Sequence, residues 1–213
     1  DGNLYVISFA HDKIKQYDGT TGEYIDIFVA SGSGGLDGPQ GLEFGPDGNL
    51  YITSEYTNQV LRYDGTTGAF IDVFVSGGLS NPQEAIFGPD GNLYVSNYFG
   101  DDVVRFDGIT GVLIDVFVSA GSGGLDTAQG LEFGPDGNLY VASENTDEVL
   151  RYDGITGAFI DAFTDNMLHK AKDLAFGPDG NLYTTSSLSN EVLAYNGGSI
   201  LVSDWDEIGR AHV

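Results

Sequence analysis

The pentapeptide Asp-Gly-Asn-Leu-Tyr begins at residues 1, 47, 90, 136 and 179, and its recurrence indicates the fold of this chain. Its successive copies are 46, 43, 46 and 43 residues apart. A period of about 40–50 residues with several short apolar segments is typical of β-propeller blades. The two alternating spacings also indicate a duplicated two-blade unit, because residues 25–75 closely resemble residues 114–163.

One complete repeat, residues 39–76, shows how a blade is built. Four short runs rich in β-branched and aromatic residues are predicted strands, at 41–44, 50–54, 59–63 and 70–75. The segments between them are rich in Gly and Asp, which favour tight turns. Four antiparallel strands per repeat make one propeller blade, whose faces are buried against neighbouring blades.

The predicted fold class is therefore all-β, a β-propeller of four-stranded antiparallel blades with about five blades present. We predict a single propeller domain over residues 1–206. It contains a partial blade of three strands at 1–30 and complete blades at 39–76, 82–119, 128–164 and 172–205. Since three two-blade pairs would close a ring, we expect the chain to be a fragment of a six-bladed propeller.

The last seven residues, 207–213, break the repeat pattern completely. Back-translated as GAG ATC GGA AGA GCA CAC GTC, they match a common short-read sequencing adapter. We hypothesise a non-native tail, translated from a library artefact at the end of a metagenomic gene fragment. Arg210 and His212 then carry no functional weight.

The composition is strongly acidic, with 32 Asp and Glu against 8 Lys and Arg and a net charge of −24. Such a charge repels nucleic acid and anionic membrane surfaces, so cations, cationic proteins or neutral glycans are the expected partners. Solubility in salty water explains the same acidity. Cys is absent, which excludes disulfides and thiolate metal sites. No apolar run approaches the roughly 18 residues of a membrane helix, so membrane insertion is not expected.

Two sequence motifs resemble those of known repeats. They are Phe-Gly-Pro-Asp-Gly-Asn-Leu-Tyr at residues 44–51 and Val-Leu-Arg-Tyr-Asp at residues 60–64. They resemble NHL repeats and the blades of streptogramin lyases and of SMP-30/gluconolactonase-like and strictosidine-synthase-like propellers. The resemblance covers residues 1–206 and implies a propeller fold. It implies less about activity, because propellers carry many unrelated functions.

In the enzymes of this group, metal-binding or proton-transfer residues stand where the first strand of several blades begins. The resemblance implies an Asp or Asn there in lactonases and often a His in lyases. This chain has Gln40, Gln83, Gln129 and Lys172 at that position. Gln is a poor metal ligand and neither acid nor base, and Lys repels a cation. We therefore assign no catalytic residue. The loop histidines His11 and His169 lie in different blades and are interpreted as solvated.

Most carboxylates recur in register and are interpreted as turn formers, but four depart from the repeat. Two follow a second strand, and two open a first strand where other blades have Gly. These loops are expected at one face of a propeller, where the carboxylates could gather Ca²⁺ or Mg²⁺. A solvated acidic rim is the competing interpretation. The candidate metal ligands are Glu55, Glu84, Glu144 and Asp173.

Aromatic residues in the loops that follow second strands are candidate ligand-binding residues. They have no evident role in a core, and exposed aromatic side chains are typical of binding surfaces. In contrast, Tyr63, Phe106, Tyr152 and Tyr195 recur in register and are predicted to pack between blades. The candidate ligand-binding residues are Phe9, Tyr56, Tyr98 and Phe99.

Two functions follow from these observations. The first is a non-catalytic NHL-type binding or scaffold module, at the surface of or outside a bacterial cell, that binds a protein or glycan through one loop face. The alternative is a divalent-metal-dependent lactonase or a streptogramin-lyase-like enzyme. The Gln, Gln, Gln, Lys set favours the first. Open blade faces also predict self-association.

Overall fold

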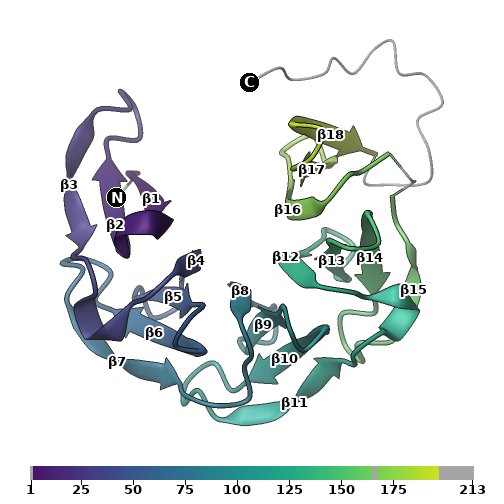
Figure 1. Ribbon diagram of the computed structural model, residues 1–213, viewed down its shortest axis with the longest axis horizontal. Helices are drawn as coiled ribbons and strands as arrows, with labels where there is room; N and C mark the ends of the chain where they lie inside the picture. Colours follow the sequence, from purple (N-terminus) through teal and green to yellow (C-terminus); the bar gives the residue numbers. More distant parts are fainter. Residues whose placement is uncertain (1, 165–166, 197–213) are drawn as a thin grey trace. The chain divides into compact units, whose positions relative to one another are not determined.

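The structure is a computed structural model that describes residues 2–164 and 167–196 (Figure 1). Its regular elements in this range are short strands and three single-turn 3-10 helices, η1 (Phe9–His11), η2 (Ser33–Gly35) and η3 (Ser122–Gly124). None of the helices in the described range is long or apolar enough to cross a membrane.

The strands follow one another as the repeat predicts. Those of the first two blades are β1 (Leu4–Ser8), β2 (Lys13–Tyr17), β3 (Tyr24–Val29), β4 (Pro39–Phe44), β5 (Leu50–Ser54), β6 (Gln59–Tyr63) and β7 (Phe70–Val75). The third and fourth blades contain β8 (Pro82–Phe87), β9 (Leu93–Asn97), β10 (Asp102–Phe106), β11 (Leu113–Val118), β12 (Ala128–Phe133), β13 (Leu139–Ser143), β14 (Glu148–Tyr152) and β15 (Phe159–Ala162). The last described strands are β16 (Ala171–Phe176), β17 (Leu182–Ser186) and β18 (Glu191–Tyr195).

These strands form five antiparallel sheets in a propeller arrangement, which confirms the predicted fold class. Three sheets have four strands each, β4 to β7, β8 to β11 and β12 to β15, and two have three, β1 to β3 and β16 to β18. The three strands predicted for residues 1–30 are confirmed. The predicted fourth strand of the last blade and the tail at 207–213 lie outside the described residues.

The chain divides into two compact units. The first comprises Asp1–Tyr94 with Phe106–Ile114, and the second comprises Val95–Arg105 with Asp115–Val213. Single-domain organisation over residues 1–206 stays a prediction. The units are described separately below.

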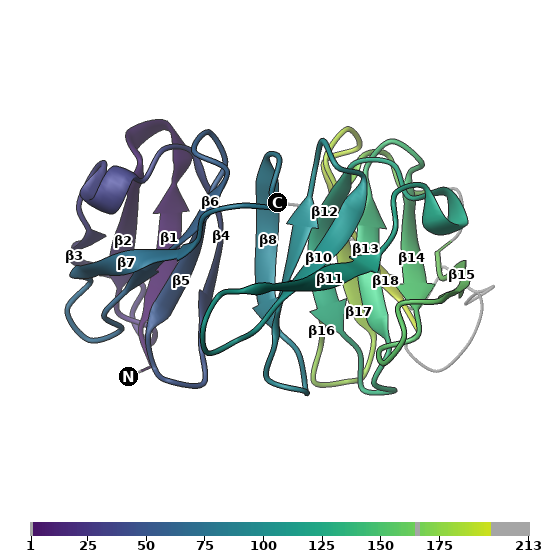
Figure 2. The same cartoon turned by 90° about the horizontal axis from the view of Figure 1, so that it is seen from below.

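The first two strands of three sheets pair in the same register. In the β4–β5 pair, Phe44 lies opposite Leu50 and Leu42 opposite Ile52, and a bulge separates Pro39 from Leu42. The same bulge recurs between Ala128 and Leu131 and between Ala171 and Leu174. From the inner strand β4 to the outer strand β7 the sheet twists strongly, so that β7 runs across the direction of β4 (Figure 2).

An aromatic interlock joins neighbouring sheets. In the first unit the ring of Tyr51 on β5 contacts Phe74 of its own sheet and Phe87 of the next sheet, each at 4.9 Å between centroids and edge to face. Tyr140 makes the same two contacts in the second unit, with Phe163 and Phe176 at 5.0 Å. Edge-to-face aromatic pairs add about 0.5–1.5 kcal/mol to the free energy gained by burial. The interlock therefore fixes one blade against the next.

The connection between the first two blades explains the longer 46-residue spacing. Its turn η2 packs on the outer part of the next sheet: a Cβ on Gly34 would lie 2.1 Å from the ring of Phe70. The hydroxyl of Tyr63 donates a 2.7 Å hydrogen bond to the carbonyl of Ser33. In the second unit η3 does the same, with Gly123 under Phe159 and with Tyr152 donating to Ser122. Alternate blades are thus joined by a longer, Gly-rich connection.

The recurring turn aspartates have the structural role that was predicted, and the recurring arginines pair with aspartates across the strands. Oδ1 of Asp64 accepts hydrogen bonds from the N–H groups of Thr66 and Thr67, which is an Asx turn. Arg62 forms a bidentate pair with Asp72 across the β6–β7 ladder, at 2.6 and 3.1 Å. The corresponding pairs in later blades are Arg105 with Asp115 and Arg151 with Asp161. The predicted packing residues Tyr63, Phe106, Tyr152 and Tyr195 are buried.

Candidate functional site

Six of the eight candidate residues lie on the loops that follow the second strand of a blade, and Glu84 and Asp173 lie on the first strands β8 and β16. We call residues 9–12, 55–58, 98–101, 144–147 and 187–190 the second-strand loops. Because each loop leaves its sheet at the end where the first strand enters, the first-strand bulges lie beside them. Bulges often re-aim side chains next to functional sites. Here they set the direction of Gln40, Gln129 and Lys172.

The last residue of every second-strand loop is an Asp or Asn in the left-handed conformation, with φ between 49° and 61°. In four loops its Oδ1 accepts a hydrogen bond from the backbone N–H that leads into the first strand of the next sheet. The pairs are Asp12 with Gly38 at 2.8 Å, Asn58 with Asn81 at 2.7 Å, Asp101 with Thr127 at 2.7 Å and Asp147 with Lys170 at 2.6 Å. Asn190 is the fifth member. The series fixes the loops, so their side chains are presented from a preorganised backbone.

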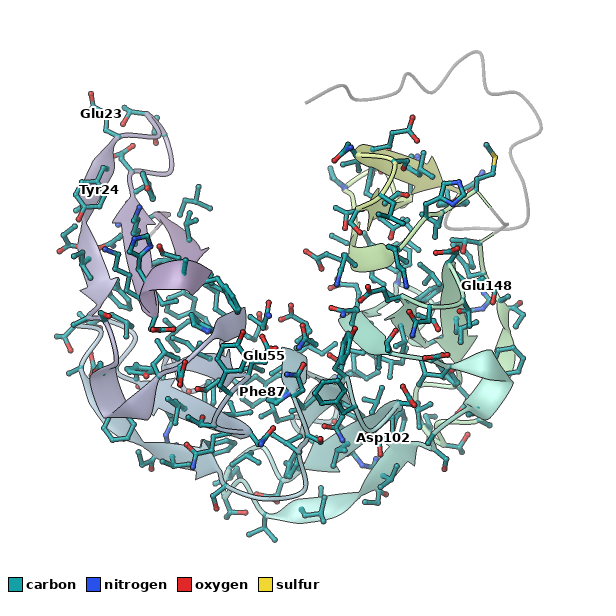
Figure 3. The ribbon with its side chains drawn as sticks, in the orientation of Figure 1. Glu23, Tyr24, Glu55, Phe87, Asp102 and Glu148 are labelled. Carbon is teal, nitrogen blue, oxygen red and sulfur yellow. The ribbon has the colours of Figure 1, made fainter. Side chains whose placement is uncertain are left out.

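In the first unit neutral amides hold the carboxylate of Glu55, the residue labelled in Figure 3. Gln40 donates to its Oε2, and the side chain of Asn81 donates to its Oε1 at 2.7 Å. Gln83, at the opening of β8, donates in turn to Oδ1 of Asn81 at 2.6 Å. Amide donors satisfy a carboxylate without neutralising its charge, so this corner of the unit stays negative.

In the second unit the equivalent carboxylate, Glu144, has a cationic partner. Gln129 donates to Oε2 of Glu144 at 2.7 Å, as Gln40 does to Glu55. Nζ of Lys172 lies 2.7 Å from the same oxygen, and Nζ of Lys170 lies 3.9 Å from Oε1. Glu144 is buried, with 8% of its surface exposed. A cation at this position would have to compete with two ammonium groups.

The other two candidate metal ligands lie against the preceding first strand. A Cβ on Gly41 would approach Oε1 of Glu84 to 2.7 Å, and a Cβ on Gly130 would approach Cα of Asp173 to 2.9 Å. Gly is therefore required opposite each acid, which explains why Gly and an acid alternate at this position. Desolvation raises the pKa of the Asp173 carboxyl.

Within residues 2–164 and 167–196, no group of three or more His, Cys, Asp or Glu side chains is arranged to hold a metal ion. The donors of the two units differ as well, since Glu55 has amide partners and Glu144 has lysines. The four-carboxylate calcium or magnesium site stays a prediction, and the function proposed below does not depend on it.

The candidate aromatic residues form two pairs. Phe9 and Tyr56, from neighbouring second-strand loops of the first unit, are 6.0 Å apart between ring centroids and meet edge to face. In the second unit Tyr98 and Phe99 are 5.1 Å apart. Tyr56 is 60% exposed and Phe99 is 71% exposed. Both large rings thus face solvent from a fixed loop.

The structure adds one residue to this set. Tyr56 and Phe99 are the second residues of their loops, and Leu188 is the second residue of the last loop, 71% exposed. Leu188 was not among the predicted binding residues because its side chain is not aromatic. Its position in the repeat could have identified it, because Leu188 is an apolar residue between Ser187 and Ser189 at the same loop position as Tyr56 and Phe99.

The two loop histidines are exposed and belong to different units. Nδ1 of His11 lies 3.2 Å from the hydroxyl of Ser8. The backbone N–H of His169 donates to the hydroxyl of Ser186. Neither contact places the imidazole against a carboxylate, as a general acid or base is commonly oriented.

No protein-family model matches the sequence, and no curated protein matches it. Solved structures of propellers do resemble it. A catalytically inactive virginiamycin B lyase from Staphylococcus aureus with quinupristin is 17% identical with a TM-score of 0.71, and the match covers 94% of this chain and 65% of that one. A chain of the nidogen/laminin complex is 18% identical with a TM-score of 0.75, covering 92% and 72%.

A streptogramin B lyase structure is also 18% identical, with a TM-score of 0.66 and coverage of 90% of this chain and 61% of that one. The chain therefore spans less than two thirds of the length of either lyase. Identities this low show the fold alone. That fold is the predicted streptogramin-lyase-like, NHL-type β-propeller.

Proposed function

We propose that this propeller is a non-catalytic binding module that holds a segment of another protein on its second-strand loops. The observation that carries the proposal is an exposed apolar side chain at one loop position, taken in each unit by itself: Tyr56 in the first unit, and Phe99 and Leu188 in the second. Large apolar side chains on rigid loops bind at little entropic cost, because their backbone is already ordered. Aromatic anchors of this kind dominate the affinity of protein interfaces.

The charge around the series favours a basic partner segment. Asp37 and Asp126 are exposed beside the second-strand loops of the first and second unit, and Glu55 has only amide partners among the contacts above. A net charge of −24 adds long-range attraction for a cation. We therefore propose a peptide segment that combines apolar residues with Lys or Arg. A neutral glycan would also stack on exposed rings, which makes it the second outcome to test.

The solved propellers support binding without identifying the partner. The nidogen structure is that of a protein complex, and the lyase structure holds quinupristin. Both show that propellers of this fold take up other molecules. The lyase alternative lacks support in the first-strand positions of this chain, since Gln40, Gln83, Gln129 and Lys172 supply neither a carboxylate ligand nor an imidazole.

The test is selection of displayed linear peptides against the wild-type chain, with a glycan array in parallel. We expect basic, apolar peptides whose affinity falls at least tenfold with Tyr56→Ser, Phe99→Ser or Leu188→Ser. The matched controls are Ile109→Ser and Ile155→Ser, which are 84% and 83% exposed but lie in the turns at the other end of their sheets.

Two results would refute the proposal. One is binding that is equally sensitive to the control substitutions, and the other is binding of glycans with no peptide selected. Turnover of a lactone or cyclic depsipeptide that depends on added Ca²⁺, Mg²⁺, Mn²⁺ or Zn²⁺ would favour the enzyme instead.

A further inference from the structure

A carboxylate and a glutamine recur together in the two units. Gln40 donates to Oε2 of Glu55 in the first unit, and Gln129 donates to Oε2 of Glu144 in the second. Each Gln lies near the beginning of a first strand, and each Glu follows the second strand of the same sheet. The first two strands of both sheets pair in the same register, with the same bulge. The two sites are therefore copies of one arrangement, and their other partners can be compared directly.

In the second unit this arrangement binds two ammonium groups. Nζ of Lys172 donates to Oε2 of Glu144 at 2.7 Å, and Nζ of Lys170 lies 3.9 Å from Oε1. The oxygen that accepts from Lys172 also accepts from Gln129, so an amide and an ammonium group share it. The side chains of Lys172 and Lys170 are 41% and 33% exposed, whereas that of Glu144 is 11% exposed. The two lysines thus reach Glu144 from the solvent side.

In the first unit Asn81 and Gln83 take the places of the two lysines. Nδ2 of Asn81 donates to Oε1 of Glu55 at 2.7 Å, whereas Gln83 donates to Oδ1 of Asn81 at 2.6 Å. An ionised carboxylate has about four acceptor positions, and the amides of Gln40 and Asn81 take one on each oxygen. Glu55 can therefore accept an ammonium group on Oε2, as Glu144 does, and keep its amide partners.

An aromatic ring beside Glu55 adds a surface for the alkyl chain of such a ligand. A Cβ on Gly38 would lie 2.8 Å from the ring of Tyr56 and 3.4 Å from Cβ of Glu55, so both side chains flank the same residue. Tyr56 is 60% exposed, and Phe9 contacts its ring edge to face. Aromatic faces attract ammonium groups, and the methylene chain behind an ammonium group packs on apolar surface. The site thus combines a negative charge with an apolar wall.

We propose that Glu55, with Gln40 and Asn81, binds a primary alkylammonium group, the side chain of a lysine in the bound segment. The inference rests on the proposed function for the source of this lysine, and it specifies the residue that the segment must present. The chain makes the same contact internally, between Lys172 and Glu144. A guanidinium group fits less well, because its two parallel donors use both carboxylate oxygens, and an amide already bonds to each.

The test uses Nα-acetyl-lysine methylamide as a probe of the wild-type chain, followed by NMR. We expect saturable shifts in the side-chain amide signals of Gln40 and Asn81. The norleucine analogue keeps the methylene chain but lacks the amine, so it should bind at least tenfold more weakly. The arginine analogue should also bind more weakly than the lysine probe. Glu55→Gln removes the charge and should weaken binding of the lysine probe at least tenfold.

A double variant tests the comparison between the two units. Asn81→Lys with Gln83→Lys gives the first unit the lysines of the second. It should weaken binding of the lysine probe at least tenfold, because an internal ammonium group then occupies Glu55. Thr20→Lys with Thr66→Lys is the matched control, since it adds the same charge in exposed turns of the same unit. The control should bind the probe as the wild type does.

Three results would overturn the site: no saturable shift with the lysine probe, equal binding of the norleucine analogue, or unchanged binding by the Asn81→Lys, Gln83→Lys variant. Tighter binding of the arginine analogue would overturn its assignment to a primary amine. The outcome is separable from that of the proposed function. Selected peptides that bind equally well with norleucine in place of lysine would refute the ammonium site alone. Binding of the lysine probe with no peptide selected would refute the proposed function alone.

Discussion

Nζ of Lys172 lies 2.7 Å from Oε2 of Glu144, whereas Gln83 takes the place of Lys172 in the first unit. A buried carboxylate that loses its cation is destabilising, so Lys172→Met should lower the free energy of unfolding by about 1 kcal/mol. For a chain of this length the melting temperature should fall by about 2–4 °C. Lys15→Met is the control, since no salt bridge to Lys15 occurs among the described residues. An equal fall in both variants would contradict the pairing.

The effect of calcium on the melting temperature distinguishes a solvated acidic surface from a metal-binding site. With Glu144 paired to lysine, we expect CaCl₂ to change the melting temperature no more than NaCl does at the same ionic strength, because only screening of the −24 charge remains. Thermal unfolding in both salts decides this. A calcium-specific rise that Glu84→Gln with Asp173→Asn removes would establish the predicted metal site.

Gly34 and Gly32 allow a clean measurement of the contact between η2 and β7. Both have left-handed backbones, with φ of 65° and 68° and ψ of 10°. Alanine at either position costs about 1–2 kcal/mol in backbone strain. Only Gly34→Ala adds a collision with the ring of Phe70, worth about 1–3 kcal/mol more. Urea unfolding of the two variants should differ by that amount, and equal stabilities would show that the connection does not hold the ring.

The Asx series predicts a ranking of substitutions at Asp101. Asp101→Asn keeps both the left-handed preference and the acceptor, so it should leave stability within about 0.5 kcal/mol of the wild type. Asp101→Gly keeps the conformation but removes the hydrogen bond from the Thr127 N–H, which should cost about 1–2 kcal/mol. Chemical unfolding of both variants checks the order. Equal destabilisation by both substitutions would mean that the charge, not the acceptor, matters there.

The pKa shifts predict that the free energy of unfolding is greatest in mild acid. Partial burial raises the pKa of Glu43 and Asp102, so the folded state binds protons more readily and gains stability as pH falls from 7 through these raised values. The opposite holds for turn aspartates such as Asp64, whose pKa is lowered first by the hydroxyl of Thr67 and then by backbone N–H groups. Their contribution is lost as pH falls below the ordinary value of about 3.9, through the lowered one.

Urea midpoints from pH 7 to pH 3 measure this profile. They should rise toward pH 5 and fall below pH 4. Asp102→Asn removes one of the raised groups while Asn97 can still donate to the side chain, so its rise between pH 7 and pH 5 should be smaller. A midpoint that decreases steadily from pH 7 would contradict the assignment.

The fold was predictable because the turn motifs, the strand patterns and the packing residues all recur in each repeat. One blade is specified by the turn motif, by the apolar strands and by the recurring Tyr and Arg residues. The observed strands begin and end close to the predicted residues. The alternating spacings of 46 and 43 residues also predicted the duplicated two-blade unit, but the sequence did not show what the three extra residues form. It takes the ring of Phe70 over Gly34 to show that the three extra residues form a packed turn.

The candidate site was less predictable, because its chemistry depends on contacts between blades. Glu55 and Glu144 are equivalent in sequence, yet one has amide donors and the other has lysines from the following blade. Such differences arise between residues about 26 to 28 positions apart, where the repeat pattern gives no side-chain direction. Leu188 was overlooked for a similar reason, since register, not residue type, places it with the exposed rings.

The hydrogen bond that Asp12, Asn58, Asp101 and Asp147 accept has a consequence for biosynthesis. In each pair the acceptor precedes its donor by 23 or 26 residues, so the acceptor leaves the ribosome first. A completed sheet thus exposes a rigid attachment point before the next sheet has been translated. Since chains are synthesised from the N-terminus at about 5–20 residues per second, each further blade takes a few seconds to be translated. The blades can therefore fold one after another during translation, and each folded blade offers the hydrogen-bond acceptor for the next.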